Sequence, residues 1–197
     1  MRAQAPRRAS GQALLILLLF AGRAAAQTPE PPGPWVLDVR GTTSGLPSHA
    51  AFFPPLSTET LVPTRGFGLN VGAHVYLLSL GPARLGVGAD YVRMRGTSDT
   101  VTATVSTVAP AVSFNFGTTN GWSYLSGGVG RGQVTAAVET ATGTVEQDSS
   151  GLTTHYGAGA RWFLRRHLGI GFDLRWHRLS WPPKGTLMAF SVGGSVH

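Results

Sequence analysis

The sequence predicts an all-β protein, specifically an eight-stranded antiparallel up-and-down transmembrane β-barrel. Three observations lead to this fold class. From residue 35 to the end, segments of about ten residues alternate bulky apolar side chains with Gly, small or charged ones. The N-terminus has the features of an export signal. The chain of 197 residues has no cysteine, so disulfides cannot stabilise it after export. Only 13% of its residues are charged, and a closed barrel can place such a chain in a membrane because it pairs every backbone group between strands.

The first 26 residues have the three parts of a secretory signal peptide. Arg2, Arg7 and Arg8 form a basic start, residues 13–21 are an apolar run, and Ala24–Ala26 offers a small-residue cleavage site. The run is shorter than the ~20 residues that a spanning helix needs, so we expect cleavage and export to the bacterial outer membrane. This segment carries four arginines and no acid, so its removal lowers the net charge from +7 to +3. We therefore expect no nucleic-acid partner.

We expect a Pro-rich lead-in over residues 27–34, which is unsuited to a sheet interior, and a barrel domain over residues 35–197. Its eight strands are expected at 35–41, 66–78, 84–95, 104–117, 121–134, 152–165, 167–179 and 186–197.

The first four strands differ in the clarity of their pattern. The short segment 35–41 is the weakest, and 66–78 is the clearest because its odd positions are apolar and its even ones small or polar. In 84–95 a Gly–Gly–Asp face opposes an apolar one. Around 104–117 the apolar residues are at odd positions from 101 to 105 but at even positions from 108 to 116. This switch predicts a bulge or a loop tip.

The last four strands follow the same rhythm with one ambiguity. In 121–134, Trp122 and Tyr124 lie in one phase, while Leu125 and Val129 lie in the other. The remaining three strands each set bulky apolar residues against Gly, Ser, Asp or Arg.

The connections alternate in length. Long ones are expected at 41–65, 96–103 and 133–151, and tight turns at 80–83, 117–120 and 166–167. This alternation is typical of barrels with long outer loops and short periplasmic turns, and an even strand number places both ends of the barrel in the periplasm.

The Gly-rich polar face indicates that polar side chains point inward, because an eight-stranded barrel has only enough interior for side chains. The alternative is a soluble barrel with the apolar face inside. The inward interpretation gives a polar lumen network of Asn70, His74, Asp90, Arg161, Asp173, Arg175 and His177. We expect Asp173 and Arg175 to pair, because unpaired charges in a closed lumen are costly. Aromatic residues near strand ends predict a girdle at the membrane surfaces, formed by Trp122, Tyr124, Trp162, Trp176 and Trp181.

Three stretches, 110–117, 121–130 and 156–163, give residues 35–197 a pattern that resembles the small outer-membrane β-barrel proteins of the OmpA and OmpX type. The resemblance implies outer-membrane lipids and lipopolysaccharide as surroundings. It also implies the barrel-assembly machinery and periplasmic chaperones as partners during biogenesis. We expect a monomer without a cofactor or metal.

The sequence therefore indicates a structural or surface-interaction protein with a side-chain-filled lumen. A narrow channel for small or apolar solutes and a lipid-modifying enzyme are the alternatives. Exposed apolar residues of the first loop, Phe52, Phe53 and Leu56, mark either an interaction site or packing on the barrel rim. Some lipid A deacylases of this scaffold place His and Ser two residues apart on a strand. No histidine of the chain has Ser two residues later, so we expect no catalytic residues.

Overall fold

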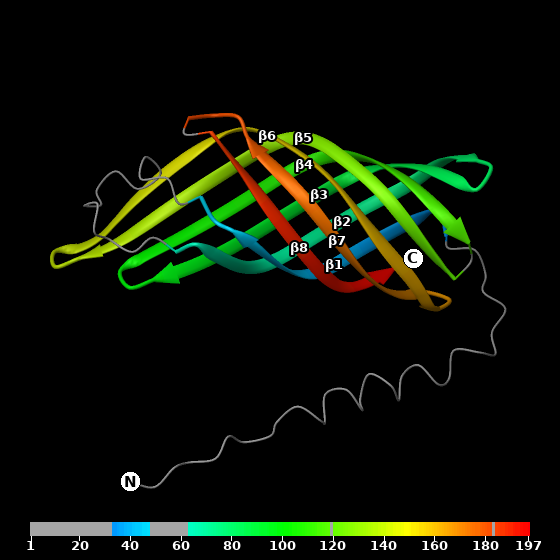
Figure 1. Ribbon diagram of the computed structural model, residues 1–197, viewed down its shortest axis with the longest axis horizontal. Helices are drawn as coiled ribbons and strands as arrows, with labels where there is room; N and C mark the ends of the chain where they lie inside the picture. The colour runs from blue at the N-terminus through cyan, green and yellow to red at the C-terminus, as the bar shows by residue number, and fades with distance from the viewer. Residues whose placement is uncertain (1–32, 48–62, 119, 183) are drawn as a thin grey trace, which may run out of the picture.

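The computed structural model describes residues 33–47, 63–118, 120–182 and 184–197. These residues form a closed barrel in which every strand is antiparallel to both neighbours and β1 pairs with β8 (Figure 1). The predicted fold class is confirmed. The strands are β1 Trp35–Gly45, β2 Arg65–Leu80, β3 Ala83–Ser98, β4 Val101–Thr118, β5 Gly121–Thr140, β6 Gly143–Arg165, β7 Leu168–Leu179 and β8 Gly185–Val196. The predicted signal peptide lies outside the described residues.

The chain enters and leaves the barrel at the same end. At one end, here called the turn end, two-residue turns join β2 to β3 and β6 to β7, and β1 begins and β8 ends there (Figure 1). The opposite end is called the loop end. In the described part of the chain, no helix is long and apolar enough to cross a membrane.

Two of the expected long loops, 96–103 and 133–151, are wrong. Both segments continue as paired strands, and the connections shrink to residues 99–100 and 141–142. The segments are rich in Thr and Val, which favour strands, and Asp99 adopts the positive φ of 45° that its turn requires. The β5–β6 hairpin consequently extends far beyond the rim (Figure 1). Of the first connection, residues 48–62 lie outside the described ones, and with them Phe52, Phe53 and Leu56.

The expected bulge or loop tip in the fourth strand is also wrong. β4 keeps one register with β3 and one with β5, and its odd positions point inward along the whole strand. The interior itself changes: Val101, Ala103 and Val105 face an apolar core, whereas Ser113 and Asn115 face a polar region. The switch in the sequence therefore reflects a change in what the inward side chains contact, from an apolar core to a polar region, and the strand itself has no bulge.

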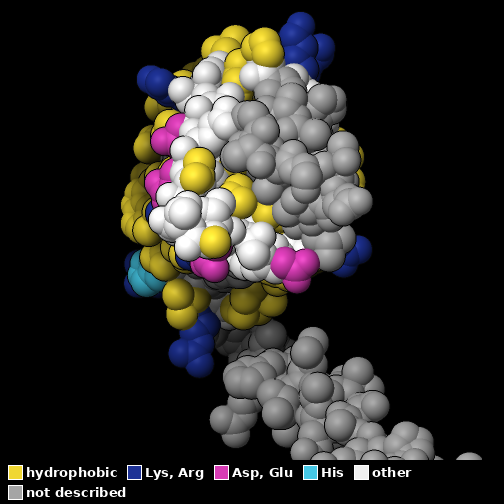
Figure 2. Space-filling model, turned by 90° about the vertical axis from the view of Figure 1, so that its left-hand side faces the viewer, with side chains coloured by type: hydrophobic (Ala, Val, Ile, Leu, Met, Phe, Trp, Pro, Cys, Tyr) yellow, Lys and Arg dark blue, Asp and Glu magenta, His cyan; other side chains and the backbone are white. Residues whose placement is uncertain are grey.

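The outer wall of the barrel is apolar. Large hydrophobic side chains are exposed on all eight strands, and the most exposed, Phe67, reaches 68%. Figure 2 looks onto the loop end and shows such side chains along the flank of the barrel. The predicted soluble alternative, with the apolar face inside, is therefore wrong. The ambiguity of the fifth strand is settled in the same way, because Leu125 and Val129 are exposed on the outer wall and Trp122 and Tyr124 are buried in the lumen.

The lumen is filled in three layers. An apolar loop-end core fills the outer part and is formed by Leu46, Val92, Met94, Val101, Ala103, Val105, Val134, Ala136, Val138, Leu179, Trp181, Leu187 and Ala189. A charged layer follows in the middle. Near the turn end, Trp122 makes edge-to-face contacts with Tyr76 and Phe163, at centroid distances of 5.0 and 5.3 Å.

Candidate functional site

The charged layer of the lumen is the candidate functional site. Its core, here called the ion-pair network, consists of three aspartates and three arginines: Asp38, Arg40, Asp90, Arg161, Asp173 and Arg175. Residues two apart on a strand share one face, and this spacing brings Asp38 beside Arg40 on β1 and Asp173 beside Arg175 on β7. No side chain of the network is more than 4% exposed.

Asp38 binds two guanidinium groups. Arg161 donates to the Asp38 carboxylate from Nε at 3.0 Å and from Nη2 at 2.5 Å. Arg40 donates from Nη2 to Asp38 Oδ1 at 2.7 Å. Charge-assisted hydrogen bonds of this kind are about twice as strong as neutral ones.

Arg40 continues the network toward β7. Its Nη1 donates to Asp173 Oδ2 at 2.6 Å and to the Tyr124 hydroxyl at 2.6 Å. The Tyr124 hydroxyl donates in turn to Asp173 Oδ2 at 3.1 Å. Arg175 Nε lies 3.2 Å from the same oxygen, so Asp173 and Arg175 form the ion pair expected from their spacing.

Asp90 ends the network on β3. Arg175 Nη1 lies 2.9 Å from Asp90 Oδ1. His74 Nε2 lies 3.4 Å from Asp90 Oδ1, and His155 Nε2 lies 3.5 Å from Asp90 Oδ2. Positive and negative groups thus alternate from Arg161 to Asp90, and the three formal charges of each sign balance.

The network braces the barrel across its interior. It joins β1 to β6, β1 to β7 and β3 to β7, and none of these pairs of strands is adjacent in the sheet. Backbone hydrogen bonds hold only neighbouring strands, so the side chains supply the contacts that cross the lumen.

Inward glycines make room for the network. A Cβ on Gly72 would lie 2.5 Å from Asp90 Oδ1, and one on Gly159 would lie 2.5 Å from the Tyr124 ring. A Cβ on Gly157 would lie 2.8 Å from Arg175 Cγ. The Gly-rich face of the sequence is therefore the space into which the long ionic side chains fold.

The structure places all seven residues of the predicted lumen network inside the barrel, each buried. Asn70 stands apart from the ion pairs and donates to Ser191 Oγ at 3.3 Å. The ring of His177 lies 5.6 Å from that of His155, and neither His177 nitrogen has a hydrogen-bond partner.

Sequence reasoning missed Asp38, Arg40, Tyr124 and His155. Asp38 and Arg40 lie on the strand with the weakest pattern, although the even phase of residues 36–44 would have placed both inside. His155 shares the phase of Arg161, and extending that phase along the strand would have included it.

Three members of the predicted aromatic girdle are wrong. Trp122, Tyr124 and Trp181 point into the lumen and are 6%, 2% and 8% exposed, because each fills space beside Gly or Ser. Trp162 and Trp176 face outward, and Trp176 stacks on Tyr156 at 5.7 Å.

Trp181 closes the loop end of the lumen. Its Nε1 donates to Ser149 Oγ at 2.7 Å, and its ring lies against Gly132 and Gly151. Among the described residues, no group of three His, Asp or Glu side chains has the geometry to hold a metal ion.

The apolar outer wall and the lumen of mutually neutralising charges define a class of β-barrels whose apolar side chains face outward and whose polar ones face inward, the reverse of a soluble barrel. The chain is similar to the attachment invasion locus protein Ail of Yersinia pestis, with 14% identity, a TM-score of 0.54, and coverage of 84% of this chain and 98% of that one. It is also similar to Neisserial surface protein A, with 13% identity, a TM-score of 0.57, and coverage of 85% and 99%. The fold is that of the small outer-membrane β-barrel proteins, as the sequence resemblance implied. No protein-family model matches the sequence, and a comparison with curated proteins gives no match.

Proposed function

We propose that the protein is an integral barrel of the bacterial outer membrane with a filled, non-conducting lumen and a structural or surface-interaction role. The observation that carries the proposal is the apolar wall around a buried ion-pair network. In water, exposed apolar surface costs about 25 cal/mol per Å², whereas a bilayer needs such a wall and a closed backbone. Outer-membrane lipids and lipopolysaccharide are the expected surroundings, and the predicted export signal fits this location.

The network supports a structural role for the lumen. Its guanidinium and carboxylate groups neutralise one another across the barrel, and the loop-end core lies above them. An ion entering from the loop end would have to displace apolar side chains and then break buried pairs. The narrow channel is therefore the less favoured function.

The β5–β6 hairpin supports a surface-interaction role. From Gly143 to Gly151, β6 pairs with β5, whereas its pairing with β7 begins only at Thr153. On the other side of 143–151 no described strand is paired. Open strand edges bind extended peptides by adding a strand, so this edge is the part of the described loop end best suited to a protein partner.

We propose a non-catalytic role as well. Lipid hydrolysis by a serine nucleophile needs a histidine base within hydrogen-bond reach. In the described ranges no histidine makes a hydrogen bond to a serine hydroxyl, and His74 and His155 face Asp90 instead. We also propose that the protein is a monomer that uses the barrel-assembly machinery and periplasmic chaperones during biogenesis.

Two measurements test the proposed function. The folded protein should float with phospholipid vesicles in a density gradient and show a heat-modifiable gel mobility. In planar bilayers it should give no ohmic current steps. Steps that disappear in Asp173→Asn but persist in the exposed control Asp99→Asn would establish the channel instead. Protein that stays in the aqueous fraction would overturn the membrane location.

A further inference from the structure

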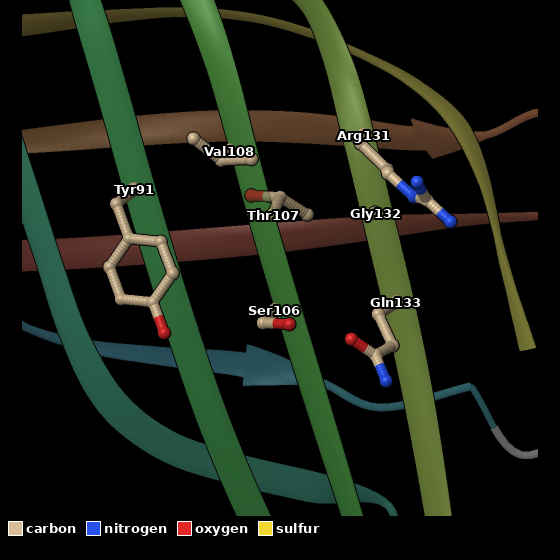
Figure 3. A pocket seen from close by; sticks show the side chains of 7 residues that line it. All are labelled: Tyr91, Ser106, Thr107, Val108, Arg131, Gly132 and Gln133. Atoms are coloured by element: carbon tan, nitrogen blue, oxygen red, sulfur yellow. The ribbon is translucent and has the colours of Figure 1, made fainter. Parts of the chain in front are cut away.

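The outer wall carries a hollow with a mixed polar and apolar lining between β3, β4 and β5, on the side of the sheet away from the lumen (Figure 3). It has a volume of about 110 Å³ and is lined by Tyr91, Ser106, Thr107, Val108, Arg131, Gly132 and Gln133. Two rows of the sheet form it. Tyr91, Val108 and Arg131 are register partners in one row, and Ser106 pairs with Gln133 in the next. Because Ser106 is small and lies between longer side chains, the space above it stays unfilled and forms the hollow.

The hollow lies where the apolar wall ends. On β3, β4 and β5 the last large apolar outward residues toward the loop end are Tyr91, Val108 and Val129. The next outward positions are Arg93, Ser106 and Arg131. A ligand in the hollow would therefore contact both apolar and polar side chains.

Three outward arginines lie in or near the hollow, and none has a carboxylate partner among the described residues. Arg93 is the register partner of Ser106, Arg95 follows it on β3, and Arg131 lines the hollow directly. All three are exposed, and none forms an ion pair with a described carboxylate. Within the described ranges, Arg131 Nη2 donates only to Ser150 Oγ, at 3.1 Å. The nearby Asp148 accepts a hydrogen bond from Thr135 Oγ1 at 2.6 Å.

We propose that this face binds the phosphorylated sugar headgroup of an outer-leaflet glycolipid. The inference rests on the proposed membrane location and deepens it by giving the expected lipopolysaccharide a binding site on this wall. Guanidinium groups match phosphate oxygens bidentately, and Tyr91, Ser106 and Gln133 offer hydrogen bonds to sugar hydroxyls.

The wall below the hollow favours a lipid over a free phosphate. Val108, Val112 and Phe114 follow one another along the outward face of β4 and are 52%, 54% and 45% exposed. Acyl chains attached to a headgroup in the hollow would lie along this apolar strip, which a free anion would leave uncovered.

The test measures binding of bisphosphorylated lipid A to the folded protein in neutral detergent micelles by native mass spectrometry. The double variant Arg93→Gln/Arg131→Gln should bind about 100-fold more weakly, at about tenfold for each lost charge-assisted contact. Ser106→Leu fills the hollow without a change of charge and should also weaken binding. The matched control is Arg178→Gln, because Arg178 is an exposed outward arginine next to the apolar wall on β7. It should bind like the wild type.

Two further ligands separate the possible sources of binding. Dephosphorylated lipid A should bind the wild type as weakly as lipid A binds the double variant, and inorganic phosphate should not compete at equal concentration. Equal losses in Arg178→Gln and the double variant would overturn the site in favour of general charge attraction. Effective competition by inorganic phosphate would overturn the lipid assignment.

The flotation assay keeps this proposal apart from the proposed function. Wild-type protein that floats and is heat-modifiable, but binds lipid A without regard to its phosphates, would overturn the headgroup site alone. Protein that does not float would overturn both.

Discussion

Replacing Asp38 by Asn should destabilise the barrel strongly. The Asp38 carboxylate accepts three hydrogen bonds from Arg161 and Arg40, at 3.0, 2.5 and 2.7 Å, and its side chain is 4% exposed. Asparagine preserves the shape but removes the charge and turns an amide donor toward a guanidinium. Arg161 then remains buried without its bidentate partner.

The expected cost is about 4 kcal/mol, the middle of the range for breaking a buried ion pair on one side. At roughly 2 kcal/mol per M of urea, the unfolding midpoint falls by about 2 M. The double variant Asp38→Asn/Arg161→Gln removes both members of the pair and restores the balance of charge. We expect it to be about 2 kcal/mol more stable than the sum of the two single effects.

The assay is equilibrium urea unfolding in lipid vesicles, followed by tryptophan fluorescence and by heat-modifiable gel mobility. Asp99→Asn is the control, because Asp99 lies in an exposed turn at the loop end. A shift in Asp38→Asn no larger than that of Asp99→Asn would refute the reasoning. If the losses of unfolding free energy in Asp38→Asn and Arg161→Gln simply added in the double variant, the pairing of Asp38 with Arg161 would be refuted as the cause of the destabilisation.

Three other outcomes follow from packing and pairing. Trp181→Ala should lower the free energy of unfolding by about 3 kcal/mol by emptying the loop-end core, and Trp181→Phe by about 1 kcal/mol through the lost bond to Ser149; equal effects would contradict this assignment. Gly159→Ala should cost about 2 kcal/mol, because its Cβ would lie 2.5 Å from the Tyr124 ring, whereas Gly185→Ala, with no atom within 4 Å, should be near neutral in the same unfolding assay. In hydrogen exchange by NMR, amides of 143–151 should alternate between slow and fast exchange, while those of 153–161 should all be slow; uniform protection of 143–151 would show that the edge is covered.

The sequence predicted the barrel well, because its outer wall obeys a simple rule. Alternation identified every strand, and the soluble alternative failed on the exposed side chains of Phe67 and its equivalents. The two hairpins that replace expected loops were missed because their outward positions carry no large apolar side chains. A polar strand such as 143–151, which extends beyond the rim, shows no apolar alternation in the sequence.

The candidate site was predicted as a polar network of inward residues that includes the Asp173–Arg175 pair, but its contacts across the lumen were not predicted. Period-two reasoning assigns a face to Asp173 and Arg175, but it cannot tell which residues meet across the lumen, because that depends on how far each strand is staggered around the barrel. Trp122 and Tyr124 were expected in the girdle at the membrane surfaces, although they fill the interior, because the phase of the fifth strand is ambiguous in the sequence. Large aromatic side chains are compatible with both surroundings.

Closing a barrel raises a problem of register that alternation alone leaves unsolved. If β1 slid by two residues along β8, every apolar side chain would still face outward and every small one inward. The same slip would carry Asp38 and Arg40 about 7 Å along the barrel, away from Arg161 on β6 and Asp173 on β7. The Asp38–Arg161 and Arg40–Asp173 pairs would then both be lost, although Asp38–Arg40 and the pairs of Arg175 would remain. The buried ion pairs of the lumen thus favour one register of β1 against β8, because only in that register do Asp38 and Arg40 meet Arg161 and Asp173.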